Sequence, residues 1–502
     1  MTTELEAKLI PGKEFRMPEL AGMPDGSIAV ADGVRELDAI YYDTTDLDLA
    51  RWGITLRHRR GEAGRPWTLK LPEHTSDTTL ARDELRFDGP DDAVPAEALD
   101  LVRGFTCNHE LQRVARLLTT RVPMHVRDAD GRVLIEIVDD SVEIREGTRD
   151  VDTFREVEVE ASANRPRNRA ALRAAVAELL EAGCRVERPV PKLVRALGPR
   201  AQQPPTVVIE PVNRHASIAE LVQHLTASSV VEIRMNDPGV RHGHDPEAVH
   251  HYRVATRRLR ADLHTFSRFL DDTTTNELLD ELRWLGHAVG PVRDLDVLGQ
   301  RFARRAPDLA ELDQPSAREL SAQLTASRLE AHRRLLEALR SDRYDGALRG
   351  LVAFAATPPM RTGAEQTTIP ASDLARRFVR RRWKQLAEAV GAADDRPTDA
   401  QLHGIRISAK KCRYAAEALE PVVGRPARRF ARRIEAVQTV LGDYHDTVVA
   451  EAWLRNAAVD LLDQRVAIGG LIAAERRDGS TLRAAWPEVW RRASKKKLRS
   501  WL

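Results

Sequence analysis

One motif occurs twice in the second half of the chain. The segments 250–260 and 403–413 both follow the pattern H-x-x-R-(V/I)-x-x-(R/K)-(R/K)-x-R. Two further matching segments, one containing Gly290 and the other Gly442, come later in the same order and at nearly the same spacing. Repetition of this kind indicates that a chain is built from similar structural units. We therefore predict that residues 212–502 form two similar halves.

Both copies of the motif have the periodicity of an α-helix. At about 100° per residue, the basic side chains of each copy fall on one side of the helix, and apolar side chains such as Tyr252 and Leu259 lie opposite. A basic stripe is usually a solvated face whose charges pair with acidic residues one turn away. Here the near neighbours are also basic, which favours an anion-binding site. The stripe consists of His250, Arg253, Arg257 and Arg260 in the first copy and His403, Arg406, Lys410 and Arg413 in the second.

Further basic runs occur in the same half of the chain. Each run alone is ordinary, but together they require either many salt bridges or a polyanionic ligand. The runs are Arg376, Arg377, Arg380, Arg381 and Arg382; Arg425, Arg428, Arg429, Arg432 and Arg433; and Lys495, Lys496 and Lys497.

Residues 1–199 have a different period. Short runs of β-forming residues, several with alternating apolar and polar side chains, are separated by turn residues, which predicts a β-barrel or sandwich. A linker at 200–211, with consecutive prolines, separates this part from the helical domain at 212–502. The predicted strands after the opening one are 39–43, 53–60, 67–71, 82–87, 119–127, 133–138, 142–146 and 154–160, and the predicted helices are 96–102, 111–118 and 169–182.

Several of these predicted strands carry a charged face. Glu4, Glu6 and Lys8 share one face of the opening strand, and in 155–160 three glutamates lie opposite two valines. One interpretation is an antiparallel sheet with a solvated face. The other is a barrel with a polar lumen, in which a metal ion neutralises the glutamates and a polyphosphate neutralises the basic residues. The strand patterns alone leave both interpretations open.

These segments together resemble the CYTH family of triphosphate tunnel metalloenzymes over roughly residues 2–198. The resemblance is carried by Glu4-x-Glu6-x-Lys8, 42–49, 56–59, Leu69-Lys70 and 156–160. It implies an eight-stranded antiparallel β-barrel whose lumen binds a linear triphosphate with a divalent metal, Mg²⁺ or Mn²⁺. It implies that triphosphate is bound by Lys8, Arg57, Arg59, Lys70, Arg82, Arg113, Arg121 and Lys192. The metal ligands that it implies are Glu4, Glu6, Asp139, Glu156, Glu158 and Glu160, and the implied catalytic residues are Glu4, Glu6 and Lys8.

The resemblance also implies an activity. CYTH proteins hydrolyse inorganic triphosphate, thiamine triphosphate or nucleoside triphosphates, and a few cyclise ATP. The two-domain form implies an inorganic triphosphatase, in which one glutamate would position or deprotonate the attacking water. Two alternatives remain open: a polyphosphate-binding protein with a silent barrel, and an adenylate cyclase. Pro191 is a small departure, since relatives often have serine before the lysine that matches Lys192.

The helical half resembles the CHAD domain over roughly residues 212–490. This resemblance implies two four-helix bundles in a pseudo-twofold relation and a basic surface that binds inorganic polyphosphate, with association with polyphosphate granules. The histidines at 242, 244, 250 and 251 offer a competing interpretation as transition-metal ligands, which the neighbouring arginines oppose. The implied polyphosphate contacts are His250, Arg253, Arg257, Arg258, Arg260, His403, Arg406, Lys410, Lys411 and Arg413.

Composition limits the remaining possibilities. The 502 residues are 42% hydrophobic, which indicates a globular chain of two or three domains, and the formal net charge of +2 names no partner. We find no signal-peptide pattern and no apolar run of membrane-spanning length, so we expect a cytoplasmic protein with no membrane partner. Aromatic residues make up only 5% of the chain, which argues against a nucleic-acid partner. A homodimer is compatible with the sequence.

Overall fold

The computed structural model describes residues 5–21, 23, 26–72, 82–146, 149–186, 190–361, 370–460 and 463–502. The chain divides into two compact units, Met1–Pro205 and Thr206–Leu502. The first is built on a β-sheet and the second is helical, which confirms the predicted fold class. In the part of the chain described here, none of the helices has the length and apolar character needed to span a bilayer.

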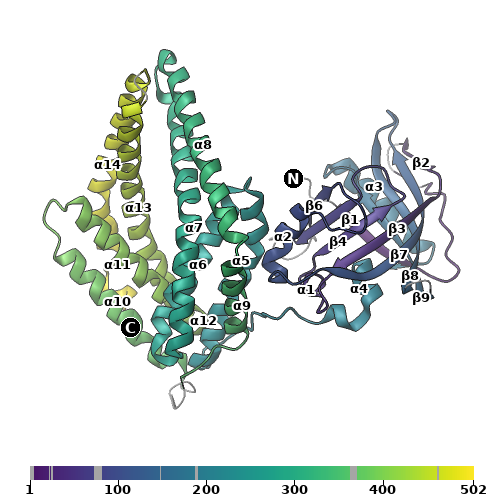
Figure 1. The fold of residues 1–502 in the computed structure, drawn as a ribbon, viewed down its shortest axis with the longest axis horizontal. Helices are drawn as coiled ribbons and strands as arrows, with labels where there is room; N and C mark the ends of the chain where they lie inside the picture. Colours follow the sequence, from purple (N-terminus) through teal and green to yellow (C-terminus); the bar gives the residue numbers. More distant parts are fainter. Residues whose placement is uncertain are drawn as a thin grey trace. The chain divides into compact units, whose positions relative to one another are not determined.

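One antiparallel sheet organises the first unit (Figure 1). Its order is β10-β1-β9-β8-β7-β3-β4-β5-β6, and β2 pairs with β7. Among the described residues no ladder joins the end strands β10 and β6. The strands are β1 (Leu5–Pro11), β2 (Ile28–Ala31), β3 (Arg35–Asp43), β4 (Thr55–Arg60), β5 (Trp67–Pro72), β6 (Arg82–Phe87), β7 (Gln112–Arg127), β8 (Val133–Glu146), β9 (Arg149–Ala161) and β10 (Cys184–Val186).

Counted over the described residues, the sheet has ten strands, where the CYTH resemblance implied eight. Strands β2 and β10 are the shortest. Each pairs with the end of a longer strand, beyond the point where that strand's pairing with another neighbour stops or nearly stops. β3 pairs with β7 as far as Arg121, and β2 pairs with the same strand from Met124 onward. β10 pairs with the last residues of β1, beyond most of its ladder with β9. Long neighbouring strands therefore leave room for two short additional ones.

The outer face of the sheet carries an apolar core. Helix α3 (Pro166–Glu181) packs there against Ile137, Val157 and Val159, which alternate with charged residues along β8 and β9. Phe15 joins the same core from the segment after β1. Because these side chains are buried, the outer face is the one that excludes water, and the opposite face is left for polar residues.

The inner face of the sheet is apolar at one end and polar along the rest of its length. At one end it carries an apolar cluster that includes Leu117, Val142 and Leu193. Leu193 comes from the short helix α4 (Lys192–Leu197), which follows Pro191. Packing of α4 on this cluster places its first residue, Lys192, where the apolar part of the inner face meets the polar part. The two other helices of this unit are α1 (Asp48–Arg51) and α2 (Ala96–Thr106).

The second unit contains two runs of helices in the same order. The repeated motif lies on α6 and on α11, and the matching glycines lie on the following long helices, Gly290 on α7 and Gly442 on α13. In Figure 1, α7 with α8 and α13 with α14 form two long helical pairs. The helices are α5 (Ile218–His242), α6 (Pro246–Phe266), α7 (Asp272–Arg305), α8 (Gln314–Leu339), α9 (Asp342–Ala356), α10 (Ala371–Gly391), α11 (Asp399–Glu417), α12 (Glu420–Val423), α13 (Arg425–Asp460) and α14 (Arg465–Ala493).

Local sequence explains where the helices of this unit begin. Ser217 and Glu220 form a capping box at the start of α5, and Thr398 and Gln401 form another at the start of α11. Each box satisfies backbone N–H groups that the first turn of a helix leaves without partners. Of the two helices that carry the basic motif, α11 begins with such a box, and α6 begins with Asp245, whose side chain accepts a hydrogen bond from the backbone N–H of Glu247.

Candidate functional site

Strand register places charged residues from several strands on the inner face of the sheet. Residues directly opposite each other in an antiparallel ladder lie on the same face. The strip begins on β1 and crosses β9 and β8 to reach β7. The opposed pairs are Glu6 with Glu160, Lys8 with Glu158, Glu156 with Asp140, and Asp140 with Arg121.

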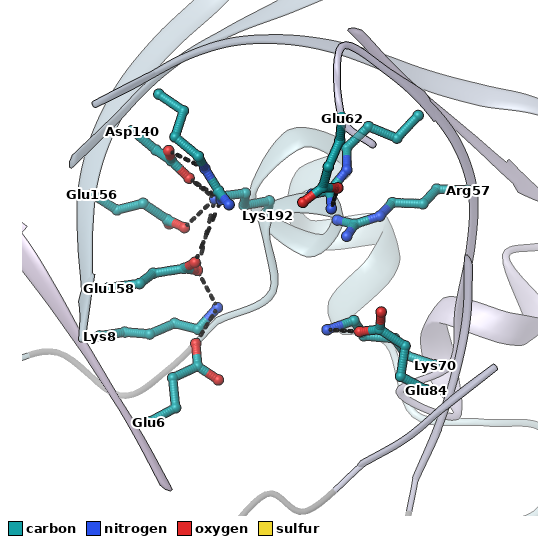
Figure 2. A network of polar contacts seen from close by, with 12 residues as sticks. Glu6, Lys8, Arg57, Glu62, Lys70, Glu84, Asp140, Glu156, Glu158 and Lys192 are labelled. Carbon is teal, nitrogen blue, oxygen red and sulfur yellow. Dashed lines mark hydrogen bonds and ion pairs between the residues drawn. The ribbon is translucent and has the colours of Figure 1, made fainter. Parts of the chain in front are cut away.

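Three carboxylates, Asp140, Glu156 and Glu158, form what we call the acidic wall (Figure 2). Asp140 is fully buried and Glu156 is 4% exposed. The Arg121 guanidinium donates two hydrogen bonds to Asp140, at 2.9 and 2.7 Å. Lys192 also donates to Asp140, and its Nζ lies 3.1 Å from Oε1 of Glu156. The buried carboxylates are thus held by two cations from β7 and α4.

Lys8 extends this network toward the start of the chain. Its Nζ lies 2.6 Å from Oε1 of Glu158 and 3.1 Å from Oε1 of Glu6. Figure 2 shows the Lys8 ammonium between these two carboxylates. The alternation of Glu6 and Lys8 along β1 therefore produces the shared face that the sequence predicted.

Basic side chains of β4 and β5 form a second wall, the basic wall, made of Arg57, Arg59 and Lys70. In Figure 2 the labelled Arg57 and Lys70 face the acidic wall across the interior of the curved sheet. Lys70 Nζ lies 2.8 Å from Oε2 of Glu84, and Arg59 pairs with Glu62. Arg57 donates to the Tyr41 hydroxyl at 3.3 Å, while its buried Nε has no hydrogen-bond partner among the described residues.

The pKa values reflect this crowding of charge. Burial alone would lower the pKa of Lys8, but the negative charges of Glu158 and Glu6 raise it. Burial raises the pKa of Glu156 to about 7, and the nearby Glu158 adds to this effect against the opposing charge of Lys192. On the basic wall, burial and the charge of Arg57 lower the pKa of Arg59 to about 9. The inner face therefore holds cations that lack full neutralisation and a carboxyl that titrates near neutral pH.

The acidic wall has the donor set of a divalent-metal site. One oxygen from each of Asp140, Glu156 and Glu158 lies within 4.8 Å of the other two. Carboxylate oxygens are the ligands that Mg²⁺ and Mn²⁺ prefer, and water or phosphate oxygens would complete the coordination. These three residues therefore fit a divalent cation of this class.

We expect metal affinity to fall at low pH. A metal ligand must be deprotonated, and the Glu156 carboxyl becomes protonated below its pKa of about 7. Binding of Mn²⁺ followed by calorimetry should weaken by roughly tenfold per pH unit below pH 7, with little change from pH 7.5 to 8.5. The Glu156→Gln variant should bind more weakly at all pH values and lose this dependence. Equal wild-type affinity at pH 6 and pH 8 would contradict the assignment.

One predicted metal ligand lies elsewhere. The side chain of Asp139 lies on the outer face of β8, whereas that of Asp140 lies on the inner face. Arg155 donates two hydrogen bonds to Asp139, at 2.8 and 2.5 Å. Its partner in the β8–β9 ladder is Val157, which belongs to the outer apolar core. Asp140, which sequence reasoning missed, takes the inner position instead. Glu84, the partner of Lys70, was also missed.

The remaining predicted residues of this unit have separate outcomes. Arg113 lies on strand β7 and not on a helix. A register shift between β3 and β7 separates it from the residues of the inner face. Its side chain donates a hydrogen bond to the Tyr42 hydroxyl at 3.1 Å and does not join the basic wall. Glu160 shares the inner face with Glu6, at the more exposed end of the strip. Glu4 lies outside the described residues, as does the side chain of Arg82 on β6.

The helical unit brings the two basic motifs together between α6 and α11. Arg257 of α6 donates to the hydroxyl of Tyr414 on α11 at 3.0 Å, and Arg258 donates to Glu417 at 3.2 Å. Arg253 donates to the carbonyl of Gly290 on α7 at 2.9 Å. The repeat is visible in this packing, because the matching Arg406 lies against Gly442 just as Arg253 lies against Gly290.

Lys410 lies among the arginines of both motifs. Its side chain is only partly exposed, and burial lowers its pKa to about 7. The charges of Arg257 and Arg406 act in the same direction, followed by those of Arg253 and Arg413. Cations from both motifs thus repel one another around this lysine, and a bound anion would relieve that repulsion.

The other predicted residues of the stripe lie around these contacts. His250 of α6 has a lowered pKa because of burial and the charge of Arg293. The ring of His403 lies 4.5 Å from the ring of His445, measured between centroids. Arg260 and Lys411 lie close enough to His264 to lower its pKa, after the larger effect of burial. The structure therefore places the predicted contacts in a central group around Lys410 and a neighbouring group around His264.

Comparisons with known proteins agree with this two-part organisation. The CYTH domain family matches residues 2–183, and the CHAD domain family matches residues 225–455. The Uncharacterized protein MT2285 of Mycobacterium tuberculosis (strain CDC 1551 / Oshkosh) is 34% identical over 446 residues, which cover 85% of this chain and 83% of that protein.

Solved structures are also similar to part of the chain, among them the following two. PptA from Streptomyces chartreusis is 23% identical, with a TM-score of 0.46, and the match covers 55% of this chain and 99% of that one. The CHAD domain from the plant Ricinus communis is 25% identical, with a TM-score of 0.43, over 59% of this chain and 94% of that one.

The two family matches confirm both resemblances inferred from the sequence. CYTH domains comprise tunnel metalloenzymes that act on phosphate compounds, and CHAD domains are associated with polyphosphate. The chain belongs to the family of two-domain proteins in which a CYTH domain is followed by a CHAD domain.

Proposed function

We propose that the CYTH unit hydrolyses inorganic triphosphate with a divalent metal and that the CHAD unit binds inorganic polyphosphate. One observation carries the first part. A three-carboxylate wall that fits a divalent cation faces a wall of arginine and lysine across the same interior. A metal–triphosphate complex would bring a cation to the acidic wall and negative charge to the basic wall.

The basic wall supports a polyanionic substrate. Arg57 has an unpartnered buried Nε, as far as the described residues extend, and Arg59 has a pKa lowered by burial and by neighbouring cations. Phosphate oxygens would supply an acceptor for the Nε of Arg57 and additional negative charge beside Arg59. Charged groups line both walls. A substrate that is charged along its whole length therefore places a charge opposite every one of these groups, whereas a thiamine or nucleoside group would place an uncharged part opposite some of them. This favours inorganic triphosphate over thiamine triphosphate or a nucleotide.

Substrate binding would rearrange the present ion pairs. Lys8, Arg121 and Lys192 now neutralise the acidic wall. A divalent cation held by Asp140, Glu156 and Glu158 would polarise the phosphoryl group and orient water there. Once the cation neutralises the acidic wall, Lys8, Arg121 and Lys192 would be free to donate hydrogen bonds to phosphate oxygens. There they would stabilise the charge of the transition state.

Phosphate release from inorganic triphosphate tests the enzymatic proposal. We expect turnover with Mg²⁺ or Mn²⁺, and a loss of at least about 100-fold in kcat/KM for Glu158→Gln, because that side chain contacts Lys8 and belongs to the acidic wall. The matched control is Glu143→Gln, which makes the same change at an exposed position on β8 that pairs with Arg145. It should retain activity.

Three outcomes would contradict the proposal. If wild-type protein released no phosphate with either metal but still bound polyphosphate, the CYTH unit would be a silent barrel. If ATP were turned over to cyclic AMP while triphosphate was left intact, the unit would be a cyclase. Equal activity of Glu158→Gln and wild type would show that the acidic wall is not the reaction site.

A further inference from the structure

A second group of basic residues lines a cavity in the helical unit. The cavity has a volume of about 590 Å³ and lies between the first turns of α13 and the end of α14 with the turn that follows. Its lining residues are Arg429, Arg432, Arg433, Arg492, Lys495, Lys497 and Leu498. None of them belongs to the repeated motif on α6 and α11.

Most of these cations are not neutralised by the protein. Of the six, only Arg492 makes an ion pair with any residue that the structure describes, to Glu488 at 2.7 Å. By contrast, Arg428, on the same helix as three of the lining residues, pairs with Glu420 and does not line the cavity. Five of the six basic residues that line the cavity therefore have no ion-pair partner among the described residues.

Helix stabilisation does not account for this arrangement. Cations are favourable at a helix C-terminus, which explains Arg492 at the end of α14. They are unfavourable at a helix N-terminus, and the first turn of α13 contains no acidic residue. Arg429 follows that turn directly, and Arg425 lies within it. Because the dipole acts only within the first turn, it gives no stabilising reason for Arg429, Arg432 and Arg433, which lie just beyond it and face the cavity.

The chemistry of the lining selects a particular class of ligand. Arginine and lysine side chains donate hydrogen bonds and accept none, and Leu498 has no polar side-chain atom. A peptide or a nucleobase would bring N–H donors that find no side-chain acceptor here. A phosphate chain carries only acceptor oxygens and a negative charge at every phosphorus, so it matches every lining cation.

We propose that this cavity is a second binding site for inorganic polyphosphate, separate from the stripe on α6 and α11. The inference rests on the proposed polyphosphate binding by the CHAD unit and extends it. Two sites on one unit would hold two segments of a long chain, or two short chains, and would raise the affinity for long chains through effective concentration.

Calorimetry of the full-length protein with a short polyphosphate of uniform length tests the proposal. Wild type should bind two chains. The cavity variant Arg429→Gln/Arg433→Gln/Lys495→Gln should bind one, and the stripe variant Arg257→Gln/Lys410→Gln should also bind one. The control Arg333→Gln/Arg334→Gln/Lys384→Gln removes three exposed charges elsewhere in the helical unit and should bind two. Circular dichroism should show equal helix content in all four proteins.

The outcomes separate this inference from the broader function. A cavity variant that still binds as many chains as wild type overturns the second site and leaves the stripe intact as the proposed site. Undiminished binding in the cavity variant and in the stripe variant overturns polyphosphate binding at both places. A single-stranded DNA with the same number of phosphates should displace polyphosphate poorly from the stripe variant, and equal displacement would overturn the assignment to a phosphate chain.

Discussion

The Asp140→Asn variant is expected to lose about 3–5 kcal/mol of unfolding free energy in the β-sheet unit. Asp140 has no exposed surface and accepts hydrogen bonds from Arg121 and from Lys192. Without the carboxylate, both cations would remain in the interior with one negative charge fewer. Replacement of one member of a buried ion pair is costly for this reason, whereas a surface pair contributes little. Urea denaturation with hydrogen exchange of the β7 and β8 amides measures the loss.

The adjacent residue provides a matched control. Asp139→Asn makes the same substitution one position earlier, where the carboxylate accepts two hydrogen bonds from Arg155. The Arg155 side chain is 37% exposed and can regain water, so we expect a loss of only about 1–2 kcal/mol. Asp139→Asn should also keep its metal affinity, and Asp140→Asn should not. Equal effects of the two substitutions on stability and on metal binding would contradict the assignment of Asp140 to the acidic wall.

Asp139 was predicted from the sequence, although the structure places Asp140, and not Asp139, on the inner face, and the strand pattern explains this difference. In β8 the buried apolar side chains switch faces along the strand: Ile135 and Ile137 belong to the outer core, and Val142 and Ile144 belong to the inner cluster beside α4. Simple alternation therefore breaks near Asp139, and the segment reads as two separate strands. Only the pairing with β9 fixes which carboxylate points inward, and that pairing is a tertiary feature.

The start of β7 was misread for a similar reason. The apolar residues Val114, Leu117 and Leu118 are three and four positions apart, which is the spacing of a helix face. In the structure Leu117 packs into the inner cluster, and Arg116 points the other way to pair with Asp38. Packing on both faces of a strand gives an apolar pattern that sequence periodicity alone cannot distinguish from a helix. Arg113 was assigned to the triphosphate site without the register shift that turns it away.

Other features followed directly from local pattern. The face shared by Glu6 and Lys8 depends only on strand alternation, and the fold class depends on the change of period between the two halves of the chain. The repeated motif predicted two equivalent helices, which are α6 and α11. The cavity at the start of α13 required the structure, because its lining combines residues some sixty positions apart in sequence. Local sequence patterns therefore predicted the individual strands and helices. Strand pairing and helix packing, which are tertiary features, determine which charged residues lie close together.

Polyphosphate binding by the stripe should take up close to one proton at pH 8. Lys410 has a pKa of about 7, so it is mostly neutral at this pH in the free protein. A phosphate chain against α6 and α11 would offset the repulsion from Arg257 and Arg406 and raise the pKa of Lys410 toward its ordinary value near 10.4. The lysine then binds a proton as the anion binds, and affinity falls as pH rises from 7 toward 10.

Calorimetry in two buffers with different ionisation enthalpies measures this proton directly. Lys410→Met should abolish the uptake and weaken binding, whereas Lys384→Met, at an exposed lysine of α10, should change neither. Arg257→Gln should weaken binding. It should also reduce the magnitude of the slope of log affinity against log salt concentration by about one, the value expected for one lost phosphate contact. Identical heats in the two buffers, or uptake that persists in Lys410→Met, would mean that the anion does not reach this lysine. Uptake confined to proteins with Lys410 would place the phosphate chain between the two repeated motifs, where their positive charges converge.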